Sequence, residues 1–197
     1  MKTIILATNN DNKVREFREM LSGGDIDVLP LKEVGIDADI EETGTTFLEN
    51  ALIKAREICK LTGKPALADD SGLCVDYLKG APGVYSSRFM GENTPYTEKN
   101  AAIIEKLAGV PKEKRGAAFH CVMALVLPGG REFIAEGKMQ GVIADAPAGE
   151  NGFGYDPIVF LPEYGMTSAQ LSPEEKNAIS HRGEALGKMI DIIKSEL

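Results

Sequence analysis

The chain has 197 residues, of which 43% are hydrophobic and 26% are charged, and both shares are ordinary for a globular protein. We therefore expect one domain over residues 1–197, long enough to bury a substantial core. The net charge of −8 argues against nonspecific binding to a nucleic-acid polymer, because such binding requires a basic surface. A small phosphorylated ligand stays compatible with this charge, since lysines, arginines and a metal ion can reverse its sign within one cleft.

The cysteines and the N-terminus indicate the compartment. The three cysteines lie far apart and form no CxxC pattern, so neither a zinc site nor a disulfide framework is indicated. The apolar run at residues 4–7 is too short for the core of a signal peptide or for a membrane span. We therefore predict a reduced, cytoplasmic protein with no membrane partner.

In the first half of the chain, short apolar runs alternate with stretches whose apolar residues recur at helical spacing. These patterns predict strands over residues 3–7 and 26–31, a helix that includes residues 14–21, and a helix from residue 47 to near residue 63. A polar turn connects the first strand to the first helix, and an acidic loop over residues 37–43 precedes the second helix.

The second half contains further strands and one hairpin. The predicted elements are an ordered loop at residues 80–88, a helix at about 97–107, hairpin strands at 117–127 and 132–144, a strand at 157–161, a helix opened by a capping box at 172–175, and a final helix. This alternation of strands and helices with one long hairpin predicts an α/β fold, in which a mixed central β-sheet is flanked by helices.

Asp69 and Asp70 follow an apolar run at the end of a predicted strand over residues 66–73. Aspartate is disfavoured in strands, and neighbouring carboxylates repel each other unless a proton or a cation intervenes. Ser71-Gly72 predicts a tight turn directly afterwards, which would place the pair at the edge of the sheet where α/β proteins bind ligands. A hard cation is one explanation, with Mg²⁺ favoured if phosphates complete its shell. A turn in which the aspartates accept backbone hydrogen bonds is the alternative.

The two aspartates need not act together. Neighbouring side chains of a strand point to opposite faces, so Asp69 and Asp70 need not share one metal ion. We assign Asp70, next to Ser71, to the cleft, and Asp69 to bracing the turn through hydrogen bonds.

The polar turn at residues 8–13 leads into the first helix. A helix N-terminus offers free N–H groups and positive potential, and Lys13 adds a full charge, so the turn suits a triphosphate. It lacks the glycines of a Walker A loop. Ordinary capping of the helix by a polar side chain is the alternative, and the residues alone favour it.

Lys54 lies on a largely apolar side of the second helix. Helical spacing places it beside Phe47, Asn50 and Ala51. Its ammonium group either extends to solvent or reaches a buried anion. Glu49 and Asn50, in the first turn of this helix, are expected on a solvated surface.

The segment Gly152-Phe153-Gly154-Tyr155-Asp156-Pro157 suits a flat ligand. Its glycines allow a close approach of the backbone, an aromatic ring can stack on a base, and Asp156 can accept hydrogen bonds. A structural turn before the next strand is the alternative.

His181 and Arg182, with Lys176 one to two helical turns earlier, form a basic cluster in an acidic chain. A solvated helix surface is the ordinary explanation for such a cluster. A contact with an anion or with the base of a nucleotide is the more specific explanation.

Taken together, these segments resemble one family, the inosine/xanthosine triphosphate pyrophosphatases, also called noncanonical purine NTP pyrophosphatases. The matching segments are ATNNDNK, EETGTTFLENALIKA, ALADDSGL, GAPGVYSSR, GFGYDPI and EKNAISHR. Each segment alone is a weak signal, but all of them occur in the order of the family and cover nearly the whole chain.

The resemblance implies Mg²⁺-dependent hydrolysis of ITP, dITP, XTP and dXTP to the monophosphate and pyrophosphate, which removes these nucleotides from the pool. It also implies a homodimer and a substrate cleft between two lobes. The chemistry suits the residues, because attack of water on the α-phosphorus requires charge neutralisation and a carboxylate that orients the water.

The resemblance further implies roles for individual residues. Asp70 would be the catalytic carboxylate and a metal ligand; Glu41 would be the second ligand, although spacing does not exclude the adjacent Glu42. The implied substrate-binding residues are Thr8, Asn9, Asn10, Asp11, Asn12, Lys13, Lys54 and Ser71 toward the phosphates and Phe153, Gly154, Tyr155, Asp156, Lys176, His181 and Arg182 toward the base and sugar. Arg182 and His181 are our candidates for donors to the 6-oxo group of the base. Adenine carries a 6-amino group at that position, so it would leave such a donor unpaired and would be rejected.

Two other functions use the same residues. A phosphotransferase would require a second acceptor substrate, and a nucleotide-sensing module would bind without Mg²⁺-dependent turnover. Release of pyrophosphate from ITP with and without Mg²⁺ separates the three functions.

Overall fold

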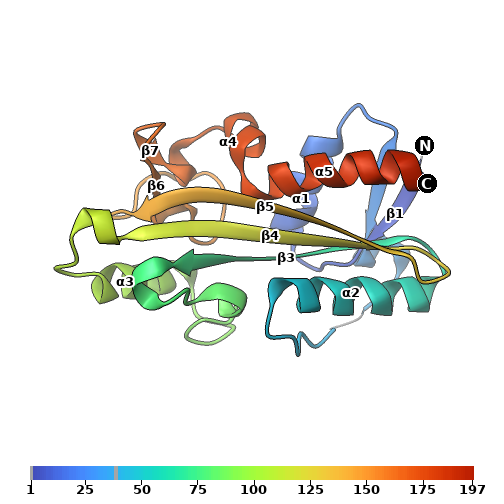
Figure 1. Cartoon of the computed structure of the whole chain (residues 1–197), viewed down its shortest axis with the longest axis horizontal. Coiled ribbons are helices and arrows are strands. Elements are labelled where there is room, and N and C mark those ends of the chain that lie inside the picture. Colours follow the sequence, from blue (N-terminus) through green and yellow to red (C-terminus); the bar gives the residue numbers. More distant parts are fainter. Residues whose placement is uncertain (1, 38–39) are drawn as a thin grey trace. The chain divides into compact units, whose positions relative to one another are not determined.

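The computed structural model describes residues 2–37 and 40–197, and its strands form one seven-stranded sheet in the order β2-β1-β3-β4-β5-β6-β7 (Figure 1). β1 pairs in parallel with β2 and β3, whereas β6 pairs antiparallel with β5 and β7. The strands are β1 (Lys2–Leu6), β2 (Ile26–Pro30), β3 (Ala66–Val75), β4 (Gly116–Val126), β5 (Glu132–Ile143), β6 (Val159–Leu161) and β7 (Met166–Thr167). The predicted α/β fold with a mixed sheet is confirmed.

The helices also follow the predicted pattern. They are α1 (Asp11–Leu21), α2 (Phe47–Thr62), α3 (Tyr96–Lys106), α4 (Pro173–Ile179) and α5 (His181–Glu196). The predicted capping box of α4 is present, with Ser172 as its N-cap. The short strand β7 was not predicted. Part of the predicted acidic loop, residues 38–39, lies outside the described residues.

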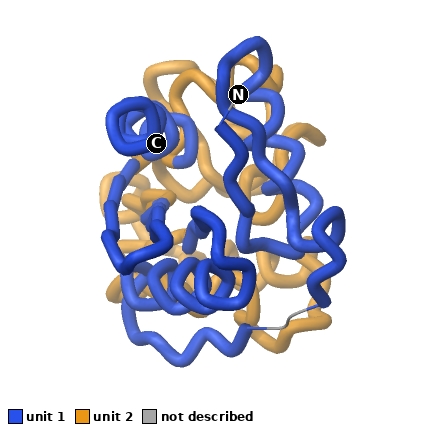
Figure 2. Tube along the Cα trace, turned by 90° about the vertical axis from the view of Figure 1, so that its right-hand side faces the viewer, with its two compact units in different colours: residues 1–70, 121–137, 182–197 blue, residues 71–120, 138–181 orange. Residues whose placement is uncertain are grey.

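The chain divides into two compact units, drawn in different colours in Figure 2. Unit 1 comprises residues 1–70, 121–137 and 182–197, and unit 2 comprises residues 71–120 and 138–181. One boundary between the units falls directly after Asp70, and another falls between His181 and Arg182. The single domain over residues 1–197 stays a prediction.

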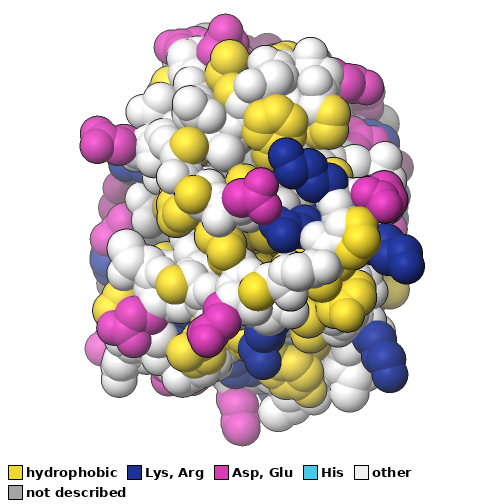
Figure 3. Space-filling view, turned by 90° about the vertical axis from the view of Figure 1, so that its left-hand side faces the viewer, with side chains coloured by type: hydrophobic (Ala, Val, Ile, Leu, Met, Phe, Trp, Pro, Cys, Tyr) yellow, Lys and Arg dark blue, Asp and Glu magenta, His cyan; other side chains and the backbone are white. Residues whose placement is uncertain are grey.

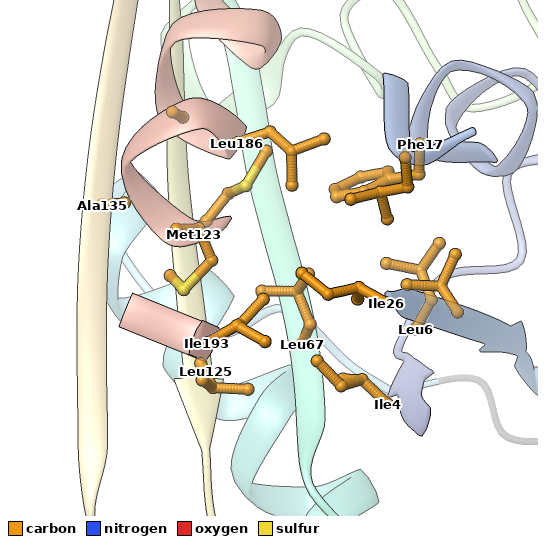
Figure 4. Packing of buried hydrophobic residues seen from close by; sticks show 14 of the residues in the cluster. Ile4, Leu6, Phe17, Ile26, Leu67, Met123, Leu125, Ala135, Leu186 and Ile193 are labelled. Atoms are coloured by element: carbon orange, nitrogen blue, oxygen red, sulfur yellow. The ribbon is translucent and has the colours of Figure 1, made fainter. Parts of the chain in front are cut away.

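In unit 1, the alternation of side chains along the strands sorts residues between two layers of helices. Leu6 and Leu67 pack with Phe17 of α1 and Leu186 of α5 in one cluster (Figure 4). Their neighbours along the strands, among them Ala68, belong to a second cluster with α2. The helices α1 and α5 therefore cover one face of the sheet in this unit, and α2 covers the other (Figure 1).

In unit 2, a third cluster joins Leu73 and Val75 of β3 to Ile103 and Leu107 of α3. Ile158, in the short 3₁₀ turn before β6, is fully buried in the same cluster. This packing fixes the segment that precedes β6, which carries the predicted base-binding residues.

β3 does not end after Asp70. It continues through Ser71 and Gly72 to Val75, so the predicted tight turn is wrong. Its neighbour β1 ends at Leu6, opposite Leu67, while β4 lies on its other side. Pairing within the sheet therefore overrides the local turn signal. Asp69 and Asp70 therefore lie just beyond the end of β1.

The surface agrees with the composition. On the face shown in Figure 3, acidic and basic side chains are interspersed with hydrophobic ones, and the net charge of the chain is −8. Among the described residues, none of the helices combines the length and the apolar character that a membrane span requires.

Replacing Leu67 by alanine should lower the free energy of unfolding by about 2–5 kcal/mol, because its fully buried side chain would leave a cavity between the sheet and α1 and α5. Urea unfolding measures the change. Leu61→Ala is the matched control, since that leucine is 59% exposed and should change stability by less than about 0.5 kcal/mol. Equal losses in both variants would contradict this description of the core.

Candidate active site

Asp69 belongs to a buried network of ion pairs on the α1 and α5 side of the sheet. Its carboxylate lies 2.9 Å from Nζ of Lys13 and 3.3 Å from Nη2 of Arg182. Arg182 also pairs with Glu16, a buried residue of α1. These contacts thus pair two carboxylates with two cations. Such neutrality matters because an uncompensated buried charge is strongly destabilising.

The pKa shifts in this network follow from burial and charge. Burial alone would raise the pKa of the Asp69 carboxyl, but Lys13 and Arg182 outweigh it and hold that pKa far below its usual range. Burial alone would likewise lower the pKa of Arg182, but Asp69 and Glu16 raise it. Asp69 is therefore a charged structural group, and it is ion pairs, not hydrogen bonds in a turn, that hold it.

Asp70 points to the opposite face, toward α2. Its Oδ2 atom accepts a hydrogen bond from Nδ2 of Asn50 at 3.0 Å. Asn50 is fully buried, and its Oδ1 atom accepts a hydrogen bond from the backbone N–H of Gly44 at 2.8 Å, which fixes the orientation of the amide. A Cβ atom at Gly44 would lie 2.6 Å from this oxygen, so the close approach requires glycine. Asn50 was expected on a solvated surface, and this expectation is wrong.

Lys54 reaches a buried anion, which settles the two alternatives left open for its side chain. Its Nζ atom lies 2.5 Å from Oε1 of Glu42 and 4.0 Å from Oδ1 of Asp70, and it donates to the carbonyl of Asp69 at 2.8 Å. Burial would lower the pKa of Lys54, but the charges of Asp70 and Glu42 raise it. Burial also raises the pKa of Asp70, against the opposing effect of Lys54. A positive charge therefore already lies beside these two carboxylates.

Glu42 contacts Lys54, the same lysine that lies 4.0 Å from Asp70. Glu41 is exposed, whereas Glu42 is partly buried against Lys54. In the described part of the chain, no group of three or more His, Cys, Asp or Glu residues is placed to hold a metal ion. Two carboxylates nevertheless fit Mg²⁺, which at nucleotide sites takes one or two carboxylates together with phosphate oxygens. The donor set Glu42 and Asp70 suits that ion.

The polar turn before α1 caps the helix, as the alternative explanation required. Oδ1 of Asn10 accepts hydrogen bonds from the backbone N–H groups of Asn12 and Lys13, at 3.0 and 3.2 Å. The N–H of Asn10 in turn donates to Oγ1 of Thr8. The exposed residues of the turn are Asn9, Asn10 and Asp11. The turn thus brings the Lys13 ammonium group to the Asp69 side of β3 with the backbone already ordered.

In unit 2, Asp156 and Lys176 form an ion pair. Both side chains are buried, and Nζ of Lys176 lies 2.7 Å from Oδ2 of Asp156. The same oxygen accepts the backbone N–H of Phe153 at 2.8 Å, and Oδ1 accepts the hydroxyl of Ser168 at 2.7 Å. The Lys176 ammonium also lies 5.3 Å from the centre of the Phe153 ring. These contacts fix the ring of Phe153, which stays partly exposed.

Tyr155 is held from the side of α3. Its hydroxyl donates to the carbonyl of Ser86 at 2.7 Å, and its ring meets that of Tyr96 edge-on at 5.2 Å. The carbonyl of Gly154 accepts a hydrogen bond from Nδ2 of Asn100 at 3.1 Å. Burial raises the pKa of Tyr155 above its ordinary value. Of the rings of Phe153 and Tyr155, that of Phe153 is therefore the accessible one.

His181 and Arg182 are neighbours with separate environments. The imidazole of His181 stacks on Phe119, with ring centres 4.9 Å apart and planes 13° from parallel. The guanidinium of Arg182 contacts Glu16 and Asp69 in unit 1. Donation from either residue to a purine stays a prediction. Ser71, the next residue of β3 after Asp70, is partly exposed.

Comparison with known proteins gives consistent matches over the whole chain. The model of the Ham1 family matches residues 4–192. A dITP/XTP pyrophosphatase of Bacillus licheniformis is 50% identical, with 96% of each chain covered, and one of Clostridium perfringens is 48% identical, with 100% of each chain covered. The solved structure of a HAM1 protein from Coxiella burnetii is 46% identical, covers 99% of this chain and 100% of its own, and has a TM-score of 0.89.

Neutralising each aspartate should affect stability differently. Asp69→Asn should lower the free energy of unfolding by about 3 kcal/mol or more, because it leaves the buried Arg182 and the partly buried Lys13 without their shared carboxylate. Asp70→Asn should change it by less than about 1 kcal/mol, since burial already disfavours the charged form of Asp70. Urea unfolding of both variants at neutral pH makes the comparison, and a larger loss in Asp70→Asn would contradict it.

Proposed function

Because the chain belongs to the Ham1 family, we propose that it hydrolyses noncanonical purine nucleoside triphosphates, namely ITP, dITP, XTP and dXTP, to the monophosphate and pyrophosphate. Its relatives from Bacillus licheniformis and Clostridium perfringens, both named dITP/XTP pyrophosphatases, support this substrate class. The observation that carries the proposal is the cluster of Asp70, Glu42 and Lys54, which combines carboxylates for a metal ion with an ammonium group for phosphates.

We propose Mg²⁺ as the cofactor, held by Asp70 and Glu42. Glu42 replaces the Glu41 of our sequence-based prediction, because Glu42 is the partly buried residue beside Lys54. When bound there, the ion would neutralise charge on the phosphates and polarise the phosphorus.

The residues of this chain supply the remaining chemistry in the proposal. Lys54 and Lys13, with the turn at residues 8–13, bind the phosphate chain through their positive charge. The carboxylate of Asp70 orients a water molecule and accepts its proton as the water oxygen bonds to the α-phosphorus. The bond from the α-phosphorus to the bridging oxygen breaks, and pyrophosphate leaves with that oxygen.

On the base side, the proposal gives Phe153 the role of stacking on the purine. We assign binding of the base and sugar also to Lys176, Asp156, the Gly154-Tyr155 backbone, His181 and Arg182. We also propose that the protein is a cytoplasmic homodimer, which sedimentation analysis of the purified chain would test.

The first experiment is an assay of pyrophosphate released from ITP, with and without Mg²⁺. The proposed hydrolase releases pyrophosphate only with Mg²⁺ and needs no acceptor other than water. A phosphotransferase would require a second acceptor, and a sensing module would bind ITP without turnover. Either result would replace the proposed function.

Asp70→Asn should reduce the rate of pyrophosphate release by about three orders of magnitude, because the base that orients water is lost. The variant should remain folded, with a free energy of unfolding within about 1 kcal/mol of that of the wild type. Retained Mg²⁺-dependent turnover would overturn the assignment of Asp70.

Glu41→Gln and Glu42→Gln form a matched pair that identifies the second metal ligand. Glu42→Gln should raise the Mg²⁺ concentration for half-maximal rate by about tenfold or more, because a charged ligand is lost. Glu41→Gln should leave this concentration within about twofold, since Glu41 is exposed. The reverse pattern in a Mg²⁺ titration would restore Glu41 as the ligand.

A further inference from the structure

The Phe153–Asp156 segment depends on a residue that the motifs do not include. Ser168 follows β7 and begins a short 3₁₀ turn, Ser168–Gln170. Its side chain is fully buried, and its hydroxyl donates to Oδ1 of Asp156 at 2.7 Å. A serine hydroxyl carries a single donor, and here it serves a carboxylate.

The hydroxyl determines how the two oxygens of Asp156 are used. With Oδ1 bound to Ser168, Oδ2 receives both the N–H of Phe153 and the ammonium of Lys176. The carboxylate therefore has a donor at each oxygen and one orientation that satisfies all of them. Without the hydroxyl, Oδ1 would be buried without this donor, and a rotated carboxylate would lose the alignment with Phe153 and Lys176.

The turn that carries Ser168 is itself held rigidly. Thr167 and Gln170 form a capping box around it, and the hydroxyl of Thr167 donates to the carbonyl of Ala148 at 2.6 Å. The N–H of Asn151 donates to the carbonyl of Ala169, and a Cβ atom at Gly149 would lie 2.4 Å from that same carbonyl group. Because both sides of the turn are anchored, the Ser168 hydroxyl is a fixed point from which Asp156 is oriented.

We propose that Ser168 is a positioning residue for substrate selection, which acts through Asp156 to hold Lys176 over the ring of Phe153. This inference rests on the proposed function, since it assigns a purine to the Phe153 side. Ser168 itself touches no substrate in the proposal. Its loss should therefore weaken the capture of the nucleotide and leave the chemistry at Asp70 unchanged.

The test is steady-state release of pyrophosphate from ITP by the full chain with Mg²⁺. Ser168→Ala should raise KM for ITP about tenfold, the effect of one hydrogen bond to a charged group, with kcat within about twofold. Ser168→Cys keeps nearly the size of the side chain but has a weak donor, so it should raise KM in the same direction. Val75→Ala is the control for a general loss of stability, because Val75 is fully buried in unit 2 and absent from the site.

A double-mutant cycle separates positioning from a merely structural role. In the Asp156→Asn background, Ser168→Ala should change KM by less than about twofold, because the carboxylate that the hydroxyl orients is gone. Equal effects in both backgrounds, or an unchanged KM in both Ser168→Ala and Ser168→Cys, would overturn the inference while wild-type turnover of ITP stands. Absence of turnover in the wild-type chain would instead overturn the proposed function, and this inference with it.

Discussion

Successive side chains of a β-strand point to opposite faces, and this geometric constraint separates two carboxylates that are adjacent in the sequence. Asp69 enters the layer of α1 and α5, where Lys13 and Arg182 hold its charge. Asp70 enters the layer of α2, where Asn50 orients it and burial raises its pKa. One carboxylate is therefore committed to the fold, while the other keeps an oxygen near a lysine and a second carboxylate.

Each buried charged side chain in these networks lies next to a side chain of opposite charge. Removing a charge from water is costly unless partners compensate it, so each buried ion in unit 1 brings an opposite charge with it. Glu16 balances Arg182, and Glu42 balances Lys54. In unit 2 the same requirement joins Asp156 to Lys176. These pairs draw together residues from separate elements, which is why the candidate site is assembled from α1, α2, β3 and α5.

The sequence predicted the elements and the motif residues better than it predicted contacts. Hydrophobic periodicity located α1, α2 and the long hairpin, because burial of one face leaves a regular pattern. The continuation of β3 past Gly72 was missed, because it depends on pairing with β4, which local turn residues do not reveal. Asn50 was misplaced for a related reason: its burial depends on β3. The signal available was its position one turn before Lys54 on the same helical side. Ser168 gave no sequence signal, since a lone serine acquires meaning only beside Asp156.

With Lys13 in its proposed role at the phosphates, its contact with Asp69 would make nucleotide binding an exchange of ions. Before any substrate arrives, the lysine near the turn at residues 8–13 already has a counter-ion 2.9 Å away within the protein, and Lys54 has one in Glu42. An incoming anion must compete with these carboxylates, so the net electrostatic gain is smaller than the local lysines alone suggest. A single orthophosphate offers one group for this competition. In the proposed function, a triphosphate with its divalent ion would engage both lysines and would bring positive charge to the carboxylates that they release. At such a site, the internal counter-ions would favour long, metal-loaded polyphosphates over the abundant free phosphate of a cell.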